Sequence, residues 1–330
     1  MPNLNLNKLP KPFLVLAPMD DVTDTVFRQI VAECSPPDMY FTEFVNVDGL
    51  QSPGRQKLLK KLRFTVKEQP LIAQIWGINP ENFRKTAQEI ADGTFAKELG
   101  LPEGVNFAGV DLNMGCPEKT AVKHGTCCAL INNRELAGEI IEASREGLNN
   151  RLPLSVKTRT GFNQIDLTWI EFFLQFKLNM LTIHGRTKKD MSKVPANWDI
   201  IGQVRELRDK HSPATLIVGN GDVESRKQAL ELAKKYQLDG IMIGRGVFHD
   251  PFVFAEKSPW TDFTKQQKID LYKKQVQLFA ETWQNNERAV HTLNRFCKVY
   301  IQGFDGAKEL RESLMHANST EELVSILSHA

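Results

Sequence analysis

The stretch "TLIVGNGDVESRKQALELAKKYQLDGIMIGRG", Thr215 to Gly246, shows how the chain is built. Its first apolar, β-branched run predicts a strand, the segment 223–237 has the spacing of a helix, and "GIMIGRG" predicts a second strand. Two strands joined through a helix form a parallel βαβ unit. The stretch therefore predicts a parallel sheet covered by helices.

The same alternation recurs along the chain. The runs that predict strands are 13–19, 39–44, 71–77, 107–115, 154–161, 180–187, 215–222 and 240–246. Eight parallel strands, each followed by a candidate helix, predict an α/β fold of the (β/α)8 TIM-barrel type rather than an open doubly wound sheet. After "GRGVFHDPFVF" the alternation stops, and the tail from Thr264 predicts helices throughout. We therefore expect a catalytic barrel domain over 1–257 and a small all-helical domain over 258–330.

The composition sets limits on location and partners. The 42 Lys and Arg nearly balance the 40 Asp and Glu, so any basic surface must be local. No apolar run approaches the roughly 18 residues of a membrane span, and the first residues lack the apolar core of a signal peptide. The five cysteines are an odd number. We expect a cytoplasmic protein with reduced thiols and no membrane contact.

Each predicted strand ends in small, polar or charged residues. These residues are Pro18, Met19, Glu43, Gln74, Asn113, Cys116, Lys157, Arg159, His184, Arg186, Asn220, Gly221, Asp222, Gly244 and Arg245. The carboxyl ends of barrel strands meet at one mouth, where the active sites of this fold lie. Glycine turns after the last two strands let backbone N–H groups approach an anion, and Arg245 adds positive charge. The pattern predicts a phosphorylated cofactor in the mouth.

None of these residues by itself identifies a ligand site. Gln74 and His184 each fit a structural role as well, whereas an unpaired Lys157 inside a strand would be costly. The segment "GNGD" differs from a dinucleotide fingerprint, because Glu224 stands where the third glycine belongs and the segment follows the seventh strand. The predicted site depends on the coincidence of eight strand ends.

The chain resembles the tRNA-dihydrouridine synthases in eight blocks, which follow in order over roughly residues 13 to 256: "APMDDVTD", "FTEF", "IAQIWG", "VDLNMGCPEKTAVKHG", "LSVKTRTG", "TIHGRT", "VGNGD" and "MIGRG". The resemblance implies an oxidoreductase in which NADPH reduces an FMN lying across the barrel mouth. The flavin then reduces the 5,6 double bond of a D-loop uridine in tRNA. The helical C-terminal domain is expected to hold the tRNA, and the protein is expected to be a monomer without a metal.

The resemblance also assigns roles to residues of the mouth. The expected cofactor-binding residues are Pro18, Met19, Asp20, Gln74, Lys157, His184, Asn220, Gly221, Asp222, Gly244 and Arg245. Lys157 would lie by the polar end of the flavin, where a cation stabilises negative charge. Asn113 and Arg159 would face the uracil.

The motif "NMGCP" places Cys116 at a strand end, and its residue type alone leaves several roles open. A zinc site with His124, Cys127 and Cys128 lacks the usual paired ligand spacing, a disulfide is disfavoured in a reduced cytosol, and an inert buried thiol is common. No base stands at a fixed short spacing to activate a covalent nucleophile. Reduction of uracil needs hydride at carbon 6 and a proton at carbon 5, and a protonated thiol is a suitable acid. The resemblance assigns this role to Cys116.

The sequence departs from the family pattern at Cys127, which stands where a glycine is usual. If the backbone there needs a positive φ, a cysteine is strained. Neither Cys127 nor Cys128 receives a chemical role.

Two basic stretches are candidates for binding RNA phosphates, 55–67 and 185–193. The first fits a solvated helix face equally well. Two rival functions also remain: a dihydroorotate dehydrogenase-like flavin oxidoreductase acting on a small pyrimidine, and an RNA-binding module on a barrel without catalysis. The first rival would need neither the helical tail nor the basic run.

Overall fold

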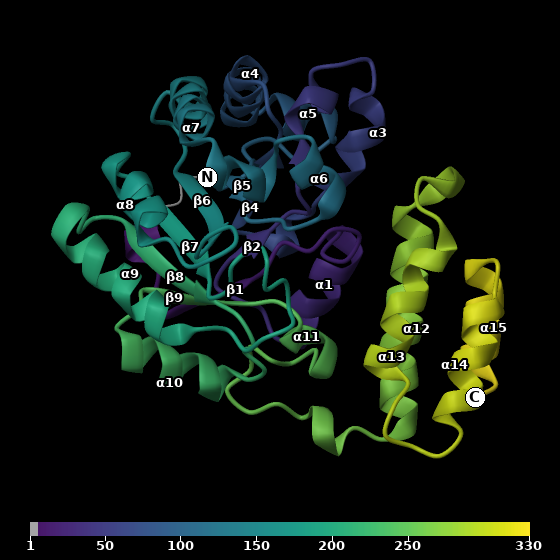
Figure 1. Ribbon diagram of the computed structural model, residues 1–330. Coiled ribbons are helices and arrows are strands. Elements are labelled where there is room, and N and C mark those ends of the chain that lie inside the picture. Colours follow the sequence, from purple (N-terminus) through teal and green to yellow (C-terminus); the bar gives the residue numbers. More distant parts are fainter. Residues whose placement is uncertain (1–5) are drawn as a thin grey trace.

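The computed structural model of the protein describes residues 6–330, and its centre is a parallel barrel (Figure 1). The barrel strands are β1 (Phe13–Leu16), β2 (Tyr40–Phe41), β4 (Leu71–Trp76), β5 (Gly109–Met114), β6 (Leu154–Arg159), β7 (Met180–His184), β8 (Leu216–Asn220) and β9 (Gly240–Ile243). They lie in the order β1-β9-β8-β7-β6-β5-β4-β2. The N–H of Leu16 donates to the carbonyl of Met39 at 3.0 Å, which brings β1 against the start of β2. The predicted (β/α)8 barrel is confirmed.

The second strand differs from the sequence prediction. One strand is expected over 39–44, but β2 ends at Phe41 and a separate β3 (Val45–Asn46) pairs further along β4. Between them, Thr42 Oγ1 accepts a hydrogen bond from the N–H of Gln74 at 3.0 Å, and Glu43 Oε1 accepts one from the N–H of Asp21 at 2.8 Å. These side chains bind neighbouring backbone, so the ladder is interrupted at the barrel mouth.

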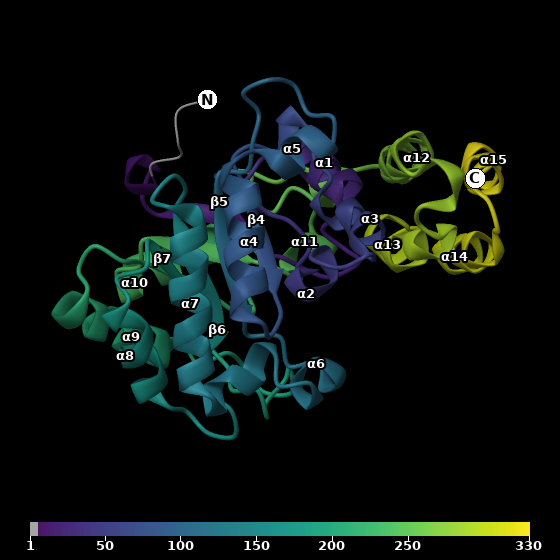
Figure 2. The ribbon, with the colours of Figure 1, turned by 90° about the horizontal axis from the view of Figure 1, so that it is seen from above.

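Helices surround the barrel, and further short helices lie within its loops (Figures 1 and 2). They are α1 (Thr25–Cys34), α2 (Val47–Leu50), α3 (Arg55–Leu59), α4 (Pro80–Ala91), α5 (Thr94–Glu98), α6 (Lys119–Lys123), α7 (Arg134–Leu148), α8 (Leu167–Gln175), α9 (Trp198–His211), α10 (Arg226–Tyr236) and α11 (Gly246–His249). Side-chain caps begin several of them: Asp24 accepts from the N–H of Phe27 in α1, and Ser225 from that of Gln228 in α10.

A helical lobe, residues 265–330, lies beside the barrel (Figures 1 and 2). It contains α12 (Lys265–Thr282), α13 (Asn294–Tyr300), α14 (Ala307–His316) and α15 (Thr320–Ser328). The lobe packs against the barrel through α12 on α1 and α13 on α11, and the rings of Phe27 and Phe296 lie 4.8 Å apart between centroids. The predicted helical C-terminal region is confirmed, while the boundary at 257/258 stays a prediction.

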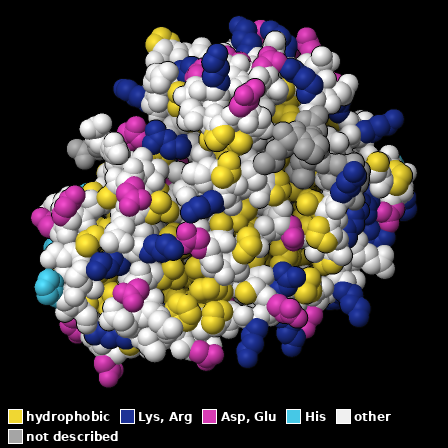
Figure 3. All heavy atoms as spheres, turned by 180° about the vertical axis from the view of Figure 1, so that it is seen from behind, with side chains coloured by type: hydrophobic (Ala, Val, Ile, Leu, Met, Phe, Trp, Pro, Cys, Tyr) yellow, Lys and Arg dark blue, Asp and Glu magenta, His cyan; other side chains and the backbone are white. Residues whose placement is uncertain are grey.

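One face of the molecule shows how the charged side chains are distributed. Seen from behind, Lys and Arg side chains are interspersed with Asp and Glu rather than gathered in one field (Figure 3). Within residues 6–330, none of the helices combines the length and the hydropathy that crossing a bilayer requires.

Candidate active site

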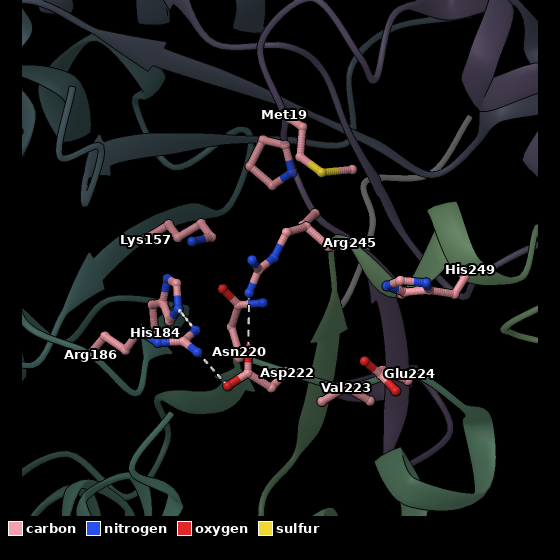
Figure 4. A pocket seen from close by; sticks show the side chains of 15 residues that line it. Met19, Lys157, His184, Arg186, Asn220, Asp222, Val223, Glu224, Arg245 and His249 are labelled. Carbon is pink, nitrogen blue, oxygen red and sulfur yellow. Dashed lines mark hydrogen bonds and ion pairs between the residues drawn. The ribbon is translucent and has the colours of Figure 1, made fainter. Parts of the chain in front are cut away.

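A cavity of about 320 Å³ opens at the mouth of the barrel (Figure 4). Its lining includes these predicted cofactor-binding residues: Pro18, Met19, Lys157, His184, Asn220, Gly221, Asp222, Gly244 and Arg245. They come from the carboxyl ends of β1, β6, β7, β8 and β9 and from the loops that follow. The remaining two residues of the predicted set, Asp20 and Gln74, do not line it.

Two glycines shape the cavity for different reasons. Gly221 has a φ of +135°, and a Cβ there would lie 2.5 Å from the Cβ of Ala196, so neither the backbone nor the space admits a side chain. At Gly244 the nearest atom to an added Cβ would be the Cβ of Ala17 at 3.5 Å, an ordinary contact. A side chain at Gly244 would therefore occupy the cavity itself rather than clash with the fold.

One carboxylate organises the cations on one side of the cavity. Asp222, at a φ of +52°, forms ion pairs with buried Arg186 and, at 3.0 Å, with the more exposed Arg245. Its Oδ2 also accepts a hydrogen bond from the N–H of Ala196 at 2.9 Å. Because two guanidinium groups share one carboxylate, this side of the cavity keeps a net positive charge.

Lys157 adds an ammonium group to the arginines of the same cavity (Figure 4). Among the described residues, nothing forms a hydrogen bond or an ion pair with its ammonium group. Burial, with the charge of Arg159 as the next cause, lowers the pKa of Lys157 to about 8. Burial and then the charge of Lys157 hold the pKa of His184 well below its usual value, so the imidazole is neutral at pH 7. An anionic ligand fits these surroundings.

Gln74 and Asn113 belong to a buried network behind the cavity lining. Gln74 Nε2 donates to Asp111 Oδ2 at 2.7 Å, and Asn113 Nδ2 donates to Gln74 Oε1 at 3.2 Å. Asn113 Oδ1 accepts from the N–H groups of Gly115 at 3.1 Å and Cys116 at 3.0 Å. The network fixes the backbone that carries Cys116. Contacts of Gln74 with a flavin and of Asn113 with a uracil stay predictions.

Arg159 holds two loops of the mouth together. Its buried guanidinium donates to the carbonyls of Gly115 at 2.9 Å, Thr187 at 3.0 Å and Met191 at 3.0 Å. The first carbonyl belongs to the loop after β5 and the other two to the loop after β7. Arg159 therefore has a structural function here, and its contact with a uracil stays a prediction.

Cys116 lies half-buried in the loop between β5 and α6. Its carbonyl accepts a hydrogen bond from the N–H of Cys128 at 3.3 Å. Cys127 has a φ of +53°, so the positive φ considered at this usual glycine position is confirmed. A hydrogen bond from the Cys127 thiol lowers the pKa of Cys116 to about 7.

A group of acids lies at the edge of the mouth. Asp20, Asp21 and Glu43 are close enough to hold a cation, but Lys61 pairs with Asp20 and Arg288 with Glu43. Protein cations therefore already neutralise these carboxylates. Within residues 6–330, the three cysteines of the 116–128 segment and His124 form no such group.

Sequence reasoning missed several residues that line the cavity: Ala17, Val223, Glu224, Gly246 and His249. Arg186 stands at a predicted strand end and in the basic stretch 185–193, but it received no role in cofactor binding. His249 lies three residues after Gly246 in α11, so the "GRGVFH" segment carried a usable signal: residues three apart on a helix share a face.

The fold and the cavity together define a (β/α)8-barrel protein with a positively charged, glycine-lined ligand site at its C-terminal mouth. The family model described as dihydrouridine synthase (Dus) matches residues 15–330. This chain belongs to the dihydrouridine synthase family. It is 43% identical over 324 residues to a probable tRNA-dihydrouridine synthase of Staphylococcus aureus (strain COL), covering 97% of this chain and 94% of the relative. It is 42% identical over 323 residues to probable tRNA-dihydrouridine synthase 2 of Bacillus subtilis (strain 168), with the same coverage.

Solved structures share the fold at much lower identity. A mutant of morphinone reductase in complex with tetrahydroNAD superposes with a TM-score of 0.50 at 12% identity, over 76% of this chain and 87% of that one. Histamine dehydrogenase from Rhizobium sp. 4-9 gives a TM-score of 0.50 at 12% identity, over 80% and 48%. At this identity the likeness concerns the fold alone.

Proposed function

We propose that the protein is a tRNA-dihydrouridine synthase that uses FMN and NADPH to reduce the uracil 5,6 double bond of D-loop uridine in tRNA. The main support for this proposal is that the chain matches the family over residues 15–330 and has an open cationic cavity at the barrel mouth. In this proposal the protein is a cytoplasmic monomer, residues 1–257 form the catalytic domain, and residues 258–330 form the tRNA-binding domain.

The residues present fit FMN. Gly244 leaves room where a Cβ would enter the cavity, and the charge of Arg245 suits a phosphate at the glycine turns. Lys157 offers an ammonium group without a partner among the described residues, suited to negative charge on the ring. When bound, FMN supplies the hydride for carbon 6 of the uracil.

Cys116 supplies the other half of the reduction, the proton at carbon 5. A general acid works best when its pKa lies near the operating pH, and the pKa of Cys116 is about 7. Asn113 holds the Cys116 N–H at 3.0 Å and so fixes the loop from which the thiol acts.

Family membership favours this proposal over both rivals. The match extends through the helical lobe, which a dihydroorotate dehydrogenase-like enzyme would not need. The decisive experiment incubates the purified protein with NADPH and unmodified tRNA and measures dihydrouridine by mass spectrometry. Reduction of free orotate or uracil without tRNA would favour the first rival. Purified protein without a flavin absorbance band would favour the RNA-binding module.

The flavin is expected to be FMN rather than FAD, because the cavity offers one phosphate cradle and residues 6–330 contain no Rossmann half for an adenine nucleotide. Heat release followed by chromatography identifies it, and recovery of FAD would contradict the proposal. Arg245→Ala should weaken retention of the cofactor by about 10- to 100-fold, since a charge-assisted contact contributes about 1.5–3 kcal/mol. Lys227→Ala, at an exposed lysine of α10, is the control.

Much of the first basic stretch is engaged within the protein. Arg55 pairs with Glu98, Lys61 with Asp20, and Arg63 with Glu287. Lys60 donates to the carbonyl of Glu287 at 2.8 Å. Exposed Lys57 has neither a hydrogen bond nor an ion pair within the part of the chain that the structure describes. It is therefore the best candidate of this stretch for a phosphate contact.

Lys57→Glu is expected to weaken tRNA binding and to reduce by about 1 the slope of log affinity against log salt, because one phosphate contact is lost. Filter binding over a salt series measures both. NADPH oxidation with an artificial acceptor should be unchanged. The matched control is Lys227→Glu, on a helix distant from α3 (Figure 1). Equal affinities for the two variants would assign the stretch to a solvated face.

A further inference from the structure

Arg186 connects the carboxylate of Asp222 with the imidazole of His184. The guanidinium is almost completely buried, and each of its three nitrogens contacts a different group. Its Nε donates to the carbonyl of Val194 at 2.5 Å, its Nη2 donates to Asp222, and its Nη1 lies 3.1 Å from His184 Nε2. Because the guanidinium is planar, these contacts together hold it in one orientation toward His184.

This contact determines which ring nitrogen of His184 carries the proton. A guanidinium only donates hydrogen bonds and stays charged in proteins, so Nε2 of the imidazole must be the acceptor. An accepting Nε2 carries no hydrogen, and the single N–H of the ring therefore lies on Nδ1. Burial and then the charges of Lys157 and Arg159 keep the pKa of the ring well below its usual value, so a second proton is disfavoured as well.

Nδ1 of His184 is open to a ligand in the cavity. The ring lines the cavity at the carboxyl end of β7 and lies between Arg186 and Lys157 (Figure 4). Within the described part of the chain, Nδ1 has no hydrogen-bond partner, and the ammonium group of Lys157 has none either. Two donors without acceptors in the same cavity fit acceptor atoms of a bound molecule.

We propose that Arg186 is a positioning residue that fixes His184 as the Nδ1–H tautomer, so that the imidazole donates a hydrogen bond to the bound flavin. The position of the proton depends only on the fold, whereas the flavin as its acceptor rests on the proposed function. Because Arg186 occupies Nε2 and the proton occupies Nδ1, the imidazole cannot act as a base. His184 thus binds as a donor.

The tautomer is measured directly by proton–nitrogen correlation spectra of the purified, flavin-loaded protein, labelled with heavy nitrogen in its histidines, at neutral pH. His184→Asn identifies the His184 signals, because they disappear from its spectrum. The parent should show a protonated Nδ1 and an unprotonated Nε2. A protonated Nε2 or an imidazolium in the parent overturns the proposal, and this result requires no variant of Arg186.

Arg186→Met should remove the preference for Nδ1, because Nε2 then loses its donor and can carry the proton itself. Arg245→Met is the matched control: Arg245 also pairs with Asp222 in the same cavity, but it makes no hydrogen bond to the His184 ring. The control should keep the Nδ1–H form. If Arg186→Met also keeps this form unchanged, other surroundings set the tautomer and the role of Arg186 is overturned.

The two ring nitrogens can also be separated by substitution. The side-chain amide of asparagine places a donor near the position of Nδ1, whereas that of glutamine places one near Nε2. His184→Asn should therefore retain FMN, and His184→Gln should bind FMN about 2- to 10-fold more weakly, the usual range for one hydrogen bond. Fluorescence of the FMN released on dilution measures both. Equal FMN affinities of the two variants would overturn the donation to the flavin.

These measurements separate the inference from the proposed function, because the tautomer does not depend on the reaction. If the parent has the Nδ1–H ring but forms no dihydrouridine in tRNA, the proposed function fails and the positioning by Arg186 stands. If dihydrouridine forms while the ring carries its proton on Nε2, the proposed function stands and the inference about Arg186 fails.

Discussion

Cys116→Ala should leave flavin reduction by NADPH nearly unchanged and slow flavin reoxidation by tRNA by about 10²–10⁴-fold, the usual contribution of a general acid. Binding of the flavin and its reduction need no proton at carbon 5, so only the second half-reaction loses its acid. Stopped-flow absorbance of the flavin band measures the two half-reactions separately. Cys116→Ala should fold normally, because the side chain is only half-buried.

Matched cysteine variants test whether the effect belongs to this thiol. Cys128→Ala and Cys297→Ala remove buried thiols, and neither should slow reoxidation. The parent should reoxidise more slowly as the pH rises above about 7, since the acid is then deprotonated, and Cys116→Ala should lose this pH dependence. Reoxidation of Cys116→Ala at the parent rate would mean that the proton comes from another group.

Arg288→Met should reduce the free energy of unfolding by about 3–5 kcal/mol, because it leaves a buried carboxylate without its cation. Arg288 is almost completely buried and pairs with Glu43, which is fully buried. It also approaches Asp21 at 3.6 Å and Asp24 at 3.8 Å, and its guanidinium lies 5.0 Å from the ring centroid of Trp283. Urea unfolding at pH 7 measures the loss.

The effect should depend on pH with a defined sign. Burial raises the pKa of Glu43 to about 7, so its neutral form is favoured in the folded protein, and stability is lost as the pH rises through 7. The destabilisation by Arg288→Met should therefore be larger at pH 8 than at pH 5. Arg288→Met combined with Glu43→Gln should recover much of the stability.

A surface ion pair gives the comparison for this cluster. Lys67 is largely exposed and lies 3.7 Å from Glu33, which keeps Lys274 as a second partner, so Lys67→Met should cost less than about 1 kcal/mol. If Arg288→Met costs no more than Lys67→Met, the cluster around Glu43 is solvated in solution and does not attach the helical lobe.

The strand pattern predicted the barrel well because each strand is a short apolar run with polar residues at its carboxyl end. The same rule placed Lys157, His184 and Asn220 on the cavity, since closure of the barrel brings all carboxyl ends to one mouth. The rule gives the end of the strand but not the partner of the side chain. Gln74 donates to Asp111 and accepts from Asn113, and the strand pattern indicated neither hydrogen bond.

Contacts between distant parts of the chain were not predictable from local patterns. Arg288 and Glu43 are 245 positions apart, and no spacing rule connects them. The strand 39–44 is interrupted where Thr42 and Glu43 accept hydrogen bonds from the N–H groups of Gln74 and Asp21, and no local pattern indicated these partners. For Cys127 the sequence indicated a strained backbone, but only the fold brings the N–H of the next residue, Cys128, to the Cys116 carbonyl.

The short loop between β1 and α1 joins the cavity to the helical lobe. Pro18 and Met19 line the cavity, while Asp24 accepts a hydrogen bond from Trp283 Nε1 at 3.1 Å and pairs with Arg288. A chain that ended at residue 257 would leave the buried carboxylate of Glu43 without its Arg288 counterion and would expose the ring of Phe27. The helical lobe therefore cannot simply be exchanged for another domain. A different RNA-binding domain in its place would require matching changes in this loop. We therefore expect the loop and the helical lobe to change together in evolution.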